Sequence, residues 1–441
     1  MKIGIIGDGG REHALAQGIC TNPESSLFVA ASNRNQGIYE LAEDYHQIEI
    51  YDLKSISDYF TKKKVDLVVV GPEAALMNGV VDVHRKKGIP IVGPTRQQAA
   101  LEGDKSFMRR LLQEKLGWGS PDWRTISTLN DAEDFIKQIG DIVVKPLGLT
   151  GGKGVRVMGI QLKNHEETLN YIAELIEKDG QVLLEEKVIG EEFSRMAFVC
   201  DGMLVPIPIM QDFKYAYDGD RGLMTGGMGA YSFSEGGLPF VQPDELTKAD
   251  QLLSEAISTI EAETDSVYRG FLYGQFMVSK KGIRLIEFNV RLGDPEALNM
   301  MALLASDASE LFYAVATGNL KSNRVLFHEK ASVSKYLVPN NYPGDAISIP
   351  IFSLDPSAVK NTGLNLIHAS VEKVVPDRWR ALGSRTFGLV GLGDHPGDIS
   401  ERIEQFLADC SIPELRHRKD VGDRQVIVNK INHMKSIRQQ I

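Results

Sequence analysis

The chain has 441 residues, of which 43% are hydrophobic and 24% are charged, a composition typical of soluble globular proteins. Its net charge of −10 argues against broad binding to nucleic acid or anionic membranes, and no apolar run approaches the length of a membrane span. The length predicts about three domains. Three distant cysteines and the lack of a signal peptide predict a cytoplasmic protein.

The first hundred residues predict an open, doubly wound sheet. A strand over residues 2–6 leads through a glycine loop, residues 7–13, into a helix, which is the start of a Rossmann-like unit. Glu12 stands where a dinucleotide-binding loop has its third glycine, and no ribose-binding acid follows the next strand, so a dehydrogenase is disfavoured. What remains is an anion site at a helix N-terminus. The loop at residues 71–79, after another buried strand, is expected to face the same ligand.

A glycine-rich stretch, residues 145–155, follows the apolar strand 142–144. Glycines let backbone N–H groups approach a phosphate closely, and Lys145 and Lys153 can offset its charge. Because Lys153 is followed by Gly154 and then a strand, this is not a Walker P-loop but a hairpin that can fold over a nucleotide as a lid. An ordinary hairpin loop is the alternative, and only other parts of a nucleotide site can decide between them.

A second hairpin is predicted over residues 271–278 and 283–288. Its second strand runs into residues that period-two geometry places on one face, namely Glu287, Asn289 and Arg291. Two oxygen ligands beside an arginine suit a Mg²⁺ that shares its coordination with ATP phosphates and waters. A solvated polar face is the alternative.

The predicted fold class is α/β, and α+β in part, with a β-rich C-terminal region. We expect a Rossmann-like domain over 1–103, a two-part domain over 104–329 with a lid subdomain at about 120–190, and a β-rich domain over 330–441.

Several motifs together resemble those of ATP-grasp ligases and, more narrowly, of the phosphoribosylamine–glycine ligase family. The resemblance covers nearly the whole chain, and the motifs that carry it are Gly9-Gly10-Arg11-Glu12-His13-Ala14, Gly71-Pro72-Glu73-Ala74, residues 225–231, Glu287-Phe288-Asn289 and Gly293-Asp294-Pro295-Glu296. It implies that a glycine carboxylate attacks the γ-phosphate of ATP, and that the amine of 5-phosphoribosylamine captures the acyl phosphate. It also implies use of Mg²⁺ or Mn²⁺, and a monomer or weak homodimer.

The resemblance also assigns roles to individual residues. Catalytic roles fall on Arg291, Lys145 and Asp212, and metal binding falls on Glu287 and Asn289. ATP binding falls on Lys105, Lys145, Gly151, Gly152, Lys153, Gly154, Glu185, Glu186, Lys187, Val188 and Glu192. Substrate binding falls on Gly9, Gly10, Arg11, Glu12, His13, Gly71, Pro72, Glu73, Lys214, Gly226, Gly227, Met228, Gly229, Asp294, Pro295 and Glu296.

The chain departs from the family's usual pattern around Asn33, at Ala75, and at Phe213, Tyr215 and Met224. These positions fall where the substrates, rather than adenine, are expected to bind. A second hypothesis is therefore a related ATP-grasp ligase with a different amine or amino acid substrate. A third, a non-catalytic nucleotide-binding protein, is opposed by the retention of Lys105, Lys145, Glu287 and Asn289.

Overall fold

The computed structural model describes residues 1–148, 154–344 and 350–439. The N-terminal region is a parallel sheet in the order β3-β2-β1-β4-β5. Its β1 and β4 are almost wholly buried apolar strands, as expected where helices cover both faces of a parallel sheet. The strands are β1 (Lys2–Ile6), β2 (Ser26–Ala31), β3 (Asp44–Gln47), β4 (Leu67–Val70) and β5 (Ile91–Val92), and the helices are α1 (Gly10–Ile19), α2 (Gln36–Leu41), α3 (Leu53–Lys63), α4 (Glu73–Met77) and α5 (Val80–Lys86).

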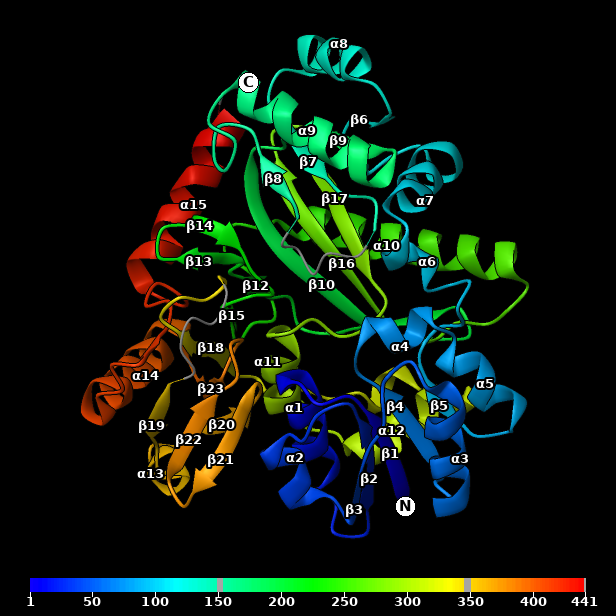
Figure 1. Cartoon of the computed structure of the whole chain (residues 1–441), viewed down its shortest axis with the longest axis vertical. Coiled ribbons are helices and arrows are strands. Elements are labelled where there is room, and N and C mark those ends of the chain that lie inside the picture. The colour runs from blue at the N-terminus through cyan, green and yellow to red at the C-terminus, as the bar shows by residue number, and fades with distance from the viewer. Residues whose placement is uncertain (149–153, 345–349, 440–441) are drawn as a thin grey trace.

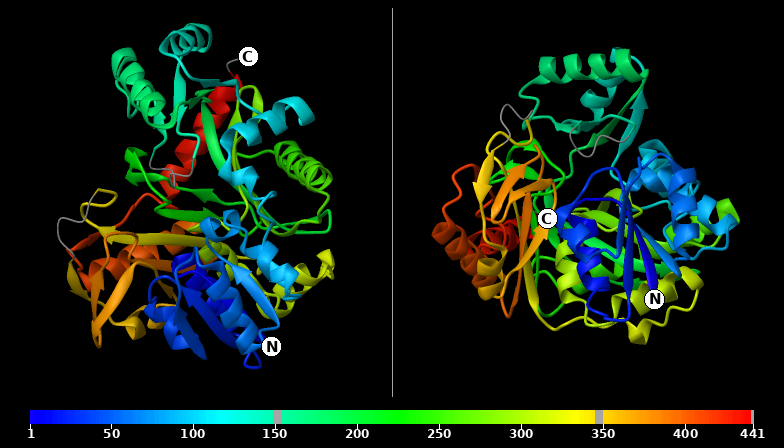
Figure 2. Two further views of the ribbon diagram at one scale, coloured as in Figure 1. Left: turned by 45° about the vertical axis from the view of Figure 1, so that its right-hand side comes forward. Right: turned by 60° about the horizontal axis from the view of Figure 1, so that its bottom comes forward.

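A connecting segment leads from this sheet to the lid subdomain. It consists of α6 (Ala100–Gly103), α7 (Lys105–Arg110) and the π-helix η1 (Leu111–Leu116). The lid has an antiparallel sheet, and two helices pack with it to form a separate hydrophobic core. Figures 1 and 2 show it standing apart from the N- and C-terminal regions. Its strands, in sheet order, are β6 (Trp123–Ile126), β9 (Val182–Glu186), β7 (Ile142–Lys145) and β8 (Arg156–Val157), and its helices are α8 (Leu129–Ile139) and α9 (His165–Asp179).

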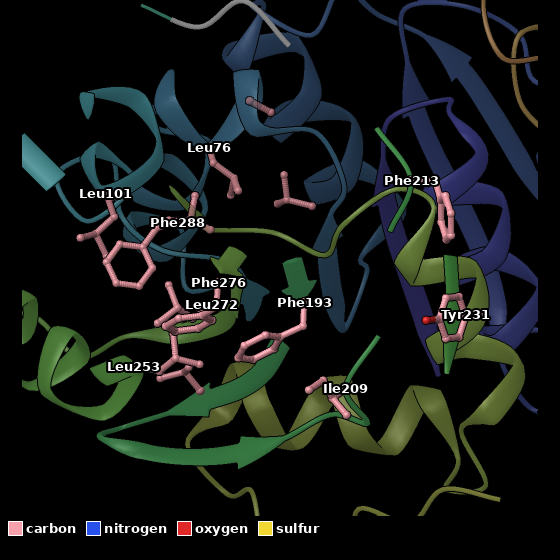
Figure 3. Packing of buried hydrophobic residues seen from close by; sticks show 14 of the residues in the cluster. Leu76, Leu101, Phe193, Ile209, Phe213, Tyr231, Leu253, Leu272, Phe276 and Phe288 are labelled. Atoms are coloured by element: carbon pink, nitrogen blue, oxygen red, sulfur yellow. The ribbon is translucent and has the colours of Figure 1, made fainter. Parts of the chain in front are cut away.

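The central antiparallel sheet lies beneath the lid and carries the second predicted hairpin (Figure 1). Stacked rings of Phe193 and Phe276, with centroids 5.3 Å apart, pack in its core with Leu253 and Leu272 (Figure 3). In sheet order the strands are β11 (Met203–Pro206), β10 (Gly190–Cys200), β16 (Arg269–Ser279) and β17 (Gly282–Asn289). In the chain, helix α10 (Pro243–Thr264) precedes β16, and helices α11 (Glu296–Leu303) and α12 (Ala308–Thr317) follow β17.

The C-terminal sheet takes two of its strands from the middle of the chain. These strands, β12 (Gln211–Asp212) and β15 (Gly229–Ser232), continue into β18 (Ala331–Pro339), β23 (Phe387–Gly393) and β20 (Asn365–His368). The motif at residues 225–231 therefore runs into a strand of the C-terminal sheet. The remaining elements are the hairpin β13 (Tyr215–Tyr217) and β14 (Arg221–Met224), η2 (Ser322–Arg324), β19 (Ile351–Ser353), α13 (Pro356–Asn361), β21 (Val371–Val375), β22 (Arg378–Ala381), α14 (Pro396–Cys410), β24 (Leu415–Arg416) and α15 (Arg424–Gln439).

The structure confirms the predicted fold class, with a parallel N-terminal sheet followed by antiparallel sheets and a β-rich C-terminal part. The sequence did not predict α11, because its eight residues, Glu-Ala-Leu-Asn-Met-Met-Ala-Leu, are nearly all apolar and show no clear polar face. In the ranges described above, no helix combines the length and the apolar character needed to cross a bilayer.

Candidate active site

A cavity of about 340 Å³ lies where all these regions meet. Arg11 and Glu73 line it from the N-terminal sheet, and Val155 lines it from the lid. The central sheet contributes the strand end that carries Glu287, while the C-terminal region contributes Arg385. The cavity therefore depends on packing between segments that are far apart in the sequence.

A buried ion cluster fixes the strand that leads into the glycine-rich loop. Glu185 accepts two hydrogen bonds from Arg109, with N···O distances of 2.7 and 2.8 Å, and pairs with Lys145 at 2.6 Å. Arg109 also donates to the carbonyl oxygens of Leu285 and Ile286 on β17. Burial alone would raise the pKa of the Glu185 carboxyl, but the charges of Arg109 and Lys145 lower it. The cluster thus joins the lid to the central sheet and orients Lys145.

Lys105, at the start of α7, lines the cavity. Its Nζ donates to the carbonyl oxygens of Pro146 and Gly148, at 3.0 and 2.8 Å. Among the described cations that line the cavity, it alone has no carboxylate within 4.0 Å. Burial lowers the pKa of this ammonium group. Lys105 is therefore available to bind an anion.

The predicted metal ligands, Glu287 and Asn289, both line the cavity, as does Lys214. Glu287 Oε1 lies 3.3 Å from the Nζ of Lys214. Burial would raise the pKa of Glu287, but Lys214, Lys145 and Lys105 hold it at about 2. The carboxylate is thus ionised, and with the Asn289 amide it offers the oxygen donors that Mg²⁺ prefers.

Arg291 is held by two carboxylates from outside the central sheet. Its guanidinium contacts Glu73 at 3.3 Å and Glu102 at 3.1 Å, and Glu102 also accepts a hydrogen bond from the backbone N–H of Val290. Burial raises the pKa of Glu102 to about 7. Burial would also raise the pKa of Glu73, but Arg291 and Arg11 lower it to about 2. The sequence did not predict Glu102, and its only signal is that it lies three residues before Lys105.

Asp212, Glu192 and Glu296 join a polar network in the wall of the cavity, where Asp212 and Glu296 belong to the lining. Gln275 donates from Nε2 to Glu192 and Asp212, at 2.8 and 3.1 Å, while Tyr273 donates to Glu296 at 2.6 Å. Local sequence patterns did not predict Gln275 and Tyr273 as site residues, although they alternate on β16 directly opposite Glu287 and Asn289 at the end of β17.

The predicted N-terminal substrate residues separate into two groups. Arg11 and Glu73 line the cavity, whereas Glu12 is buried and accepts from the backbone N–H of Gly9 and from Arg11. The ring of His13 packs against His368 and accepts from the backbone N–H of that residue at 2.8 Å. The predicted substrate residues of this region that do not line the cavity are Gly9, Gly10, Glu12, His13, Gly71 and Pro72.

The two later substrate loops also divide between lining and support. Gly226, Asp294 and Glu296 line the cavity, while Met228 is fully buried. The supporting residues are Gly227, Met228, Gly229 and Pro295.

The predicted adenine segment lies outside the lining of this cavity. Glu186 pairs with Lys281 at 2.7 Å, and Lys187 donates to Asp141 at 3.2 Å, while Val188 follows the end of β9. Gly154 accepts a hydrogen bond from Tyr171 through its carbonyl oxygen. Gly151, Gly152 and Lys153 lie outside the described residues.

The altered positions of the family motif do not line the cavity. In the extended segment that begins with β12, Asp212 and Lys214 face the cavity, while Phe213 points to the opposite side. Figure 3 shows the Phe213 ring beside Tyr231, and the guanidinium of Arg418 lies 4.7 Å from its centroid. Tyr215 and Met224 pair across the β13–β14 hairpin. The residues beside these altered positions that do face the cavity are the same as in the usual motif of the family.

A small antiparallel lid above a central sheet, with lysines and a Glu-x-Asn strand end around one cavity, defines an ATP-grasp protein. The family model described as "Phosphoribosylglycinamide synthetase, ATP-grasp (A) domain" matches residues 103–297, and the corresponding "N domain" model matches residues 1–102. The chain belongs to the phosphoribosylamine–glycine ligase family.

Individual relatives agree with this assignment. Proteins named phosphoribosylamine–glycine ligase from Methanothermobacter thermautotrophicus and Methanopyrus kandleri are 39% and 38% identical to this chain. The matches cover 99% of this chain and 100% and 99% of the relatives, respectively. The crystal structure of phosphoribosylamine–glycine ligase from Thermotoga maritima has the same fold, with a TM-score of 0.78, 24% identity, and coverage of 96% of this chain and 100% of that one.

Proposed function

We propose that this protein joins glycine to 5-phosphoribosylamine at the expense of ATP, through a glycyl phosphate intermediate. The products are glycinamide ribonucleotide, ADP and phosphate, in de novo purine biosynthesis. The observation that carries the choice of substrates is that Phe213, Tyr215 and Met224 do not line the cavity, whereas Asp212 and Lys214 do. The names of the relatives that match the whole chain support the same choice over a related ligase with another acceptor.

Positioning and charge neutralisation supply most of the catalysis that we propose. Lys105, Lys145 and the loop that ends at Gly154 bind the ATP phosphates, with Gly151, Gly152 and Lys153 assigned from the resemblance alone. The backbone of residues 185–188 contacts adenine, and Glu192 binds the ribose hydroxyls. Arg291, oriented by Glu73 and Glu102, stabilises the transferred phosphoryl group or the glycine carboxylate. Closure of the lid excludes water that would hydrolyse the acyl phosphate.

We further propose that Glu287 and Asn289 hold Mg²⁺ or Mn²⁺ together with ATP. Within the described ranges, no three His, Cys, Asp or Glu side chains cluster in a way that could hold a metal ion. A metal here would therefore take its other ligands from the nucleotide and from water, as Mg²⁺ commonly does. When bound, the metal would offset charge on the ATP phosphates.

We also propose domain limits of 1–103, 104–329 and 330–441, a cytoplasmic location, and a monomer or weak homodimer.

A substrate panel with the purified full-length protein tests the proposal. ADP release should require Mg²⁺, glycine and freshly prepared 5-phosphoribosylamine together, and it should be lost when any one is omitted. Alanine, serine and simple alkyl amines serve as alternative substrates. ADP release with one of these, and none with the proposed pair, would favour a related ligase. ATP binding without ADP release for any pair would favour a non-catalytic protein.

A further inference from the structure

Three segments from different regions meet at the edge of the cavity around one guanidinium group. Arg385, which lies just before β23, donates from Nη1 to the carbonyl oxygens of Gly226 and Asp294, at 2.7 and 2.6 Å. A third carbonyl, that of Gly227, accepts from the same atom at 3.2 Å. Its Nη2 donates to the carboxylate of Asp294 at 2.7 Å. One side chain thus holds the two later loops that carry predicted substrate residues, at 226–229 and 294–296.

The two loops touch each other where they meet Arg385. Gly227 has a φ of +109°, and a Cβ at that position would lie 2.5 Å from Cδ of Pro295. Only glycine tolerates both this backbone conformation and this contact. The close approach brings the carbonyl oxygens of both loops to the same place, where the guanidinium of Arg385 offsets their mutual repulsion.

Tyr336 completes the junction from the strand beside β23. It donates from Oη to Asp294 at 2.5 Å, and the guanidinium of Arg385 lies 4.7 Å from the centre of its ring. A Cβ at Gly10 would lie 2.0 Å from the same Oη, so the N-terminal glycine loop also packs here. Immediately after Asp294 and Pro295, α11 begins and packs on β18 and β23 (Figure 1).

The contacts of Arg385 separate it from the ATP side of the cavity. Its described hydrogen bonds and ion pair go to residues 226, 227 and 294. Lys105 and Lys145, which are assigned to ATP, instead contact residues of the lid. Glu287, which is assigned to the metal, contacts Lys214. Loss of Arg385 should therefore disturb the two substrate loops while leaving the phosphate-binding lysines in place.

We propose that Arg385 is the positioning residue through which the C-terminal domain shapes the part of the site that receives the amine substrate. The inference rests on the proposed ligase function. It predicts that Arg385 acts on the affinity for the amine through the loops at 226–227 and 294, and not on the binding of ATP.

Steady-state kinetics of the full-length Arg385→Ala and Arg385→Lys variants test this inference. Arg385→Ala should raise KM for 5-phosphoribosylamine by about 10- to 100-fold, because hydrogen bonds from a charged donor are lost. KM for ATP should stay within about twofold of wild type, since no ATP-side contact changes. Arg385→Lys keeps the charge but not the planar arrangement of donors, so its KM for 5-phosphoribosylamine should lie between those of wild type and Arg385→Ala. Millimolar methylguanidinium should partly restore the amine KM of Arg385→Ala.

Arg380→Ala is the matched control, because Arg380 lies on neighbouring β22 and pairs only at the surface with Glu372, at 2.8 Å. An equal rise in KM for ATP, glycine and the amine, together with a lower Tm and no rescue, would assign Arg385 a general structural role and overturn the inference. Kinetics like those of Arg380→Ala would also overturn it. If Arg385→Ala is insoluble, the KM values for 5-phosphoribosylamine and ATP are compared in Arg385→Lys and Arg385→Gln instead. Wild-type protein that makes no product from glycine and phosphoribosylamine would instead refute the proposed function.

Discussion

Replacing Glu185 with alanine should leave two buried cations without their counter-charge. The Arg109 side chain is 0% exposed and that of Lys145 is 6% exposed, and both contact this carboxylate. Removing one partner of a buried ion pair costs about 3–5 kcal/mol. In a domain of 150–250 residues each kcal/mol lowers Tm by about 2–4 °C, so we expect a fall of roughly 6–20 °C.

Scanning calorimetry of Glu185→Ala, Glu185→Gln and Glu186→Ala measures this effect. Glu185→Gln keeps an acceptor for Arg109 but loses the charge, and should show a smaller fall. Glu186→Ala is the matched control, because the adjacent Glu186 pairs with the exposed Lys281 and such a pair contributes about 1 kcal/mol or less. Equal Tm values for Glu185→Ala and Glu186→Ala would refute the view that the buried cluster holds the lid to the central sheet.

Three further changes probe the rest of the molecule. Burial lowers the pKa of His368 to about 4, whereas a histidine in the unfolded chain titrates near pH 6.5. As the pH falls, the unfolded state therefore gains a proton before the folded state does. The free energy of unfolding should keep its full value above about pH 6.5 and be lower by about 2 kcal/mol at pH 5. Thermal melts of His368→Gln should lose part of this pH dependence, while exposed His165→Gln should keep it; identical pH profiles would contradict the assignment. Glu287→Ala should abolish Mg²⁺-dependent ADP release with the fold intact by circular dichroism, and unchanged turnover would exclude the proposed metal role. Phe213→His, which restores the residue usual in the family, should lower Tm because this ring is buried, yet change KM for glycine by less than about twofold; a larger change would mean that position 213 does influence the substrate site.

Local patterns in the sequence were sufficient to predict several parts of the fold and of the site. The buried strands around residues 2–6 and 65–70, the lid hairpin and the central hairpin follow from hydrophobic periodicity and glycine positions, which act over a few residues. Period-two geometry likewise brought Glu287 and Asn289 to one face of β17, and the structure gives both a place in the cavity lining.

Only the tertiary structure decided which distant residues complete the site. Arg109 and Glu185 are 76 positions apart, and Arg385 and Asp294 are 91 apart, so no local period relates them. The structure also placed His13 against His368, away from the cavity, and Phe213 behind its wall. The physical reason is that the packing of separate sheets decides which charged groups meet as ion pairs. The same packing decides whether a residue faces the cavity or the protein interior. The sequence determined the elements and the chemistry they carry, and the packing of the N-terminal, central and C-terminal sheets decided which of those groups meet.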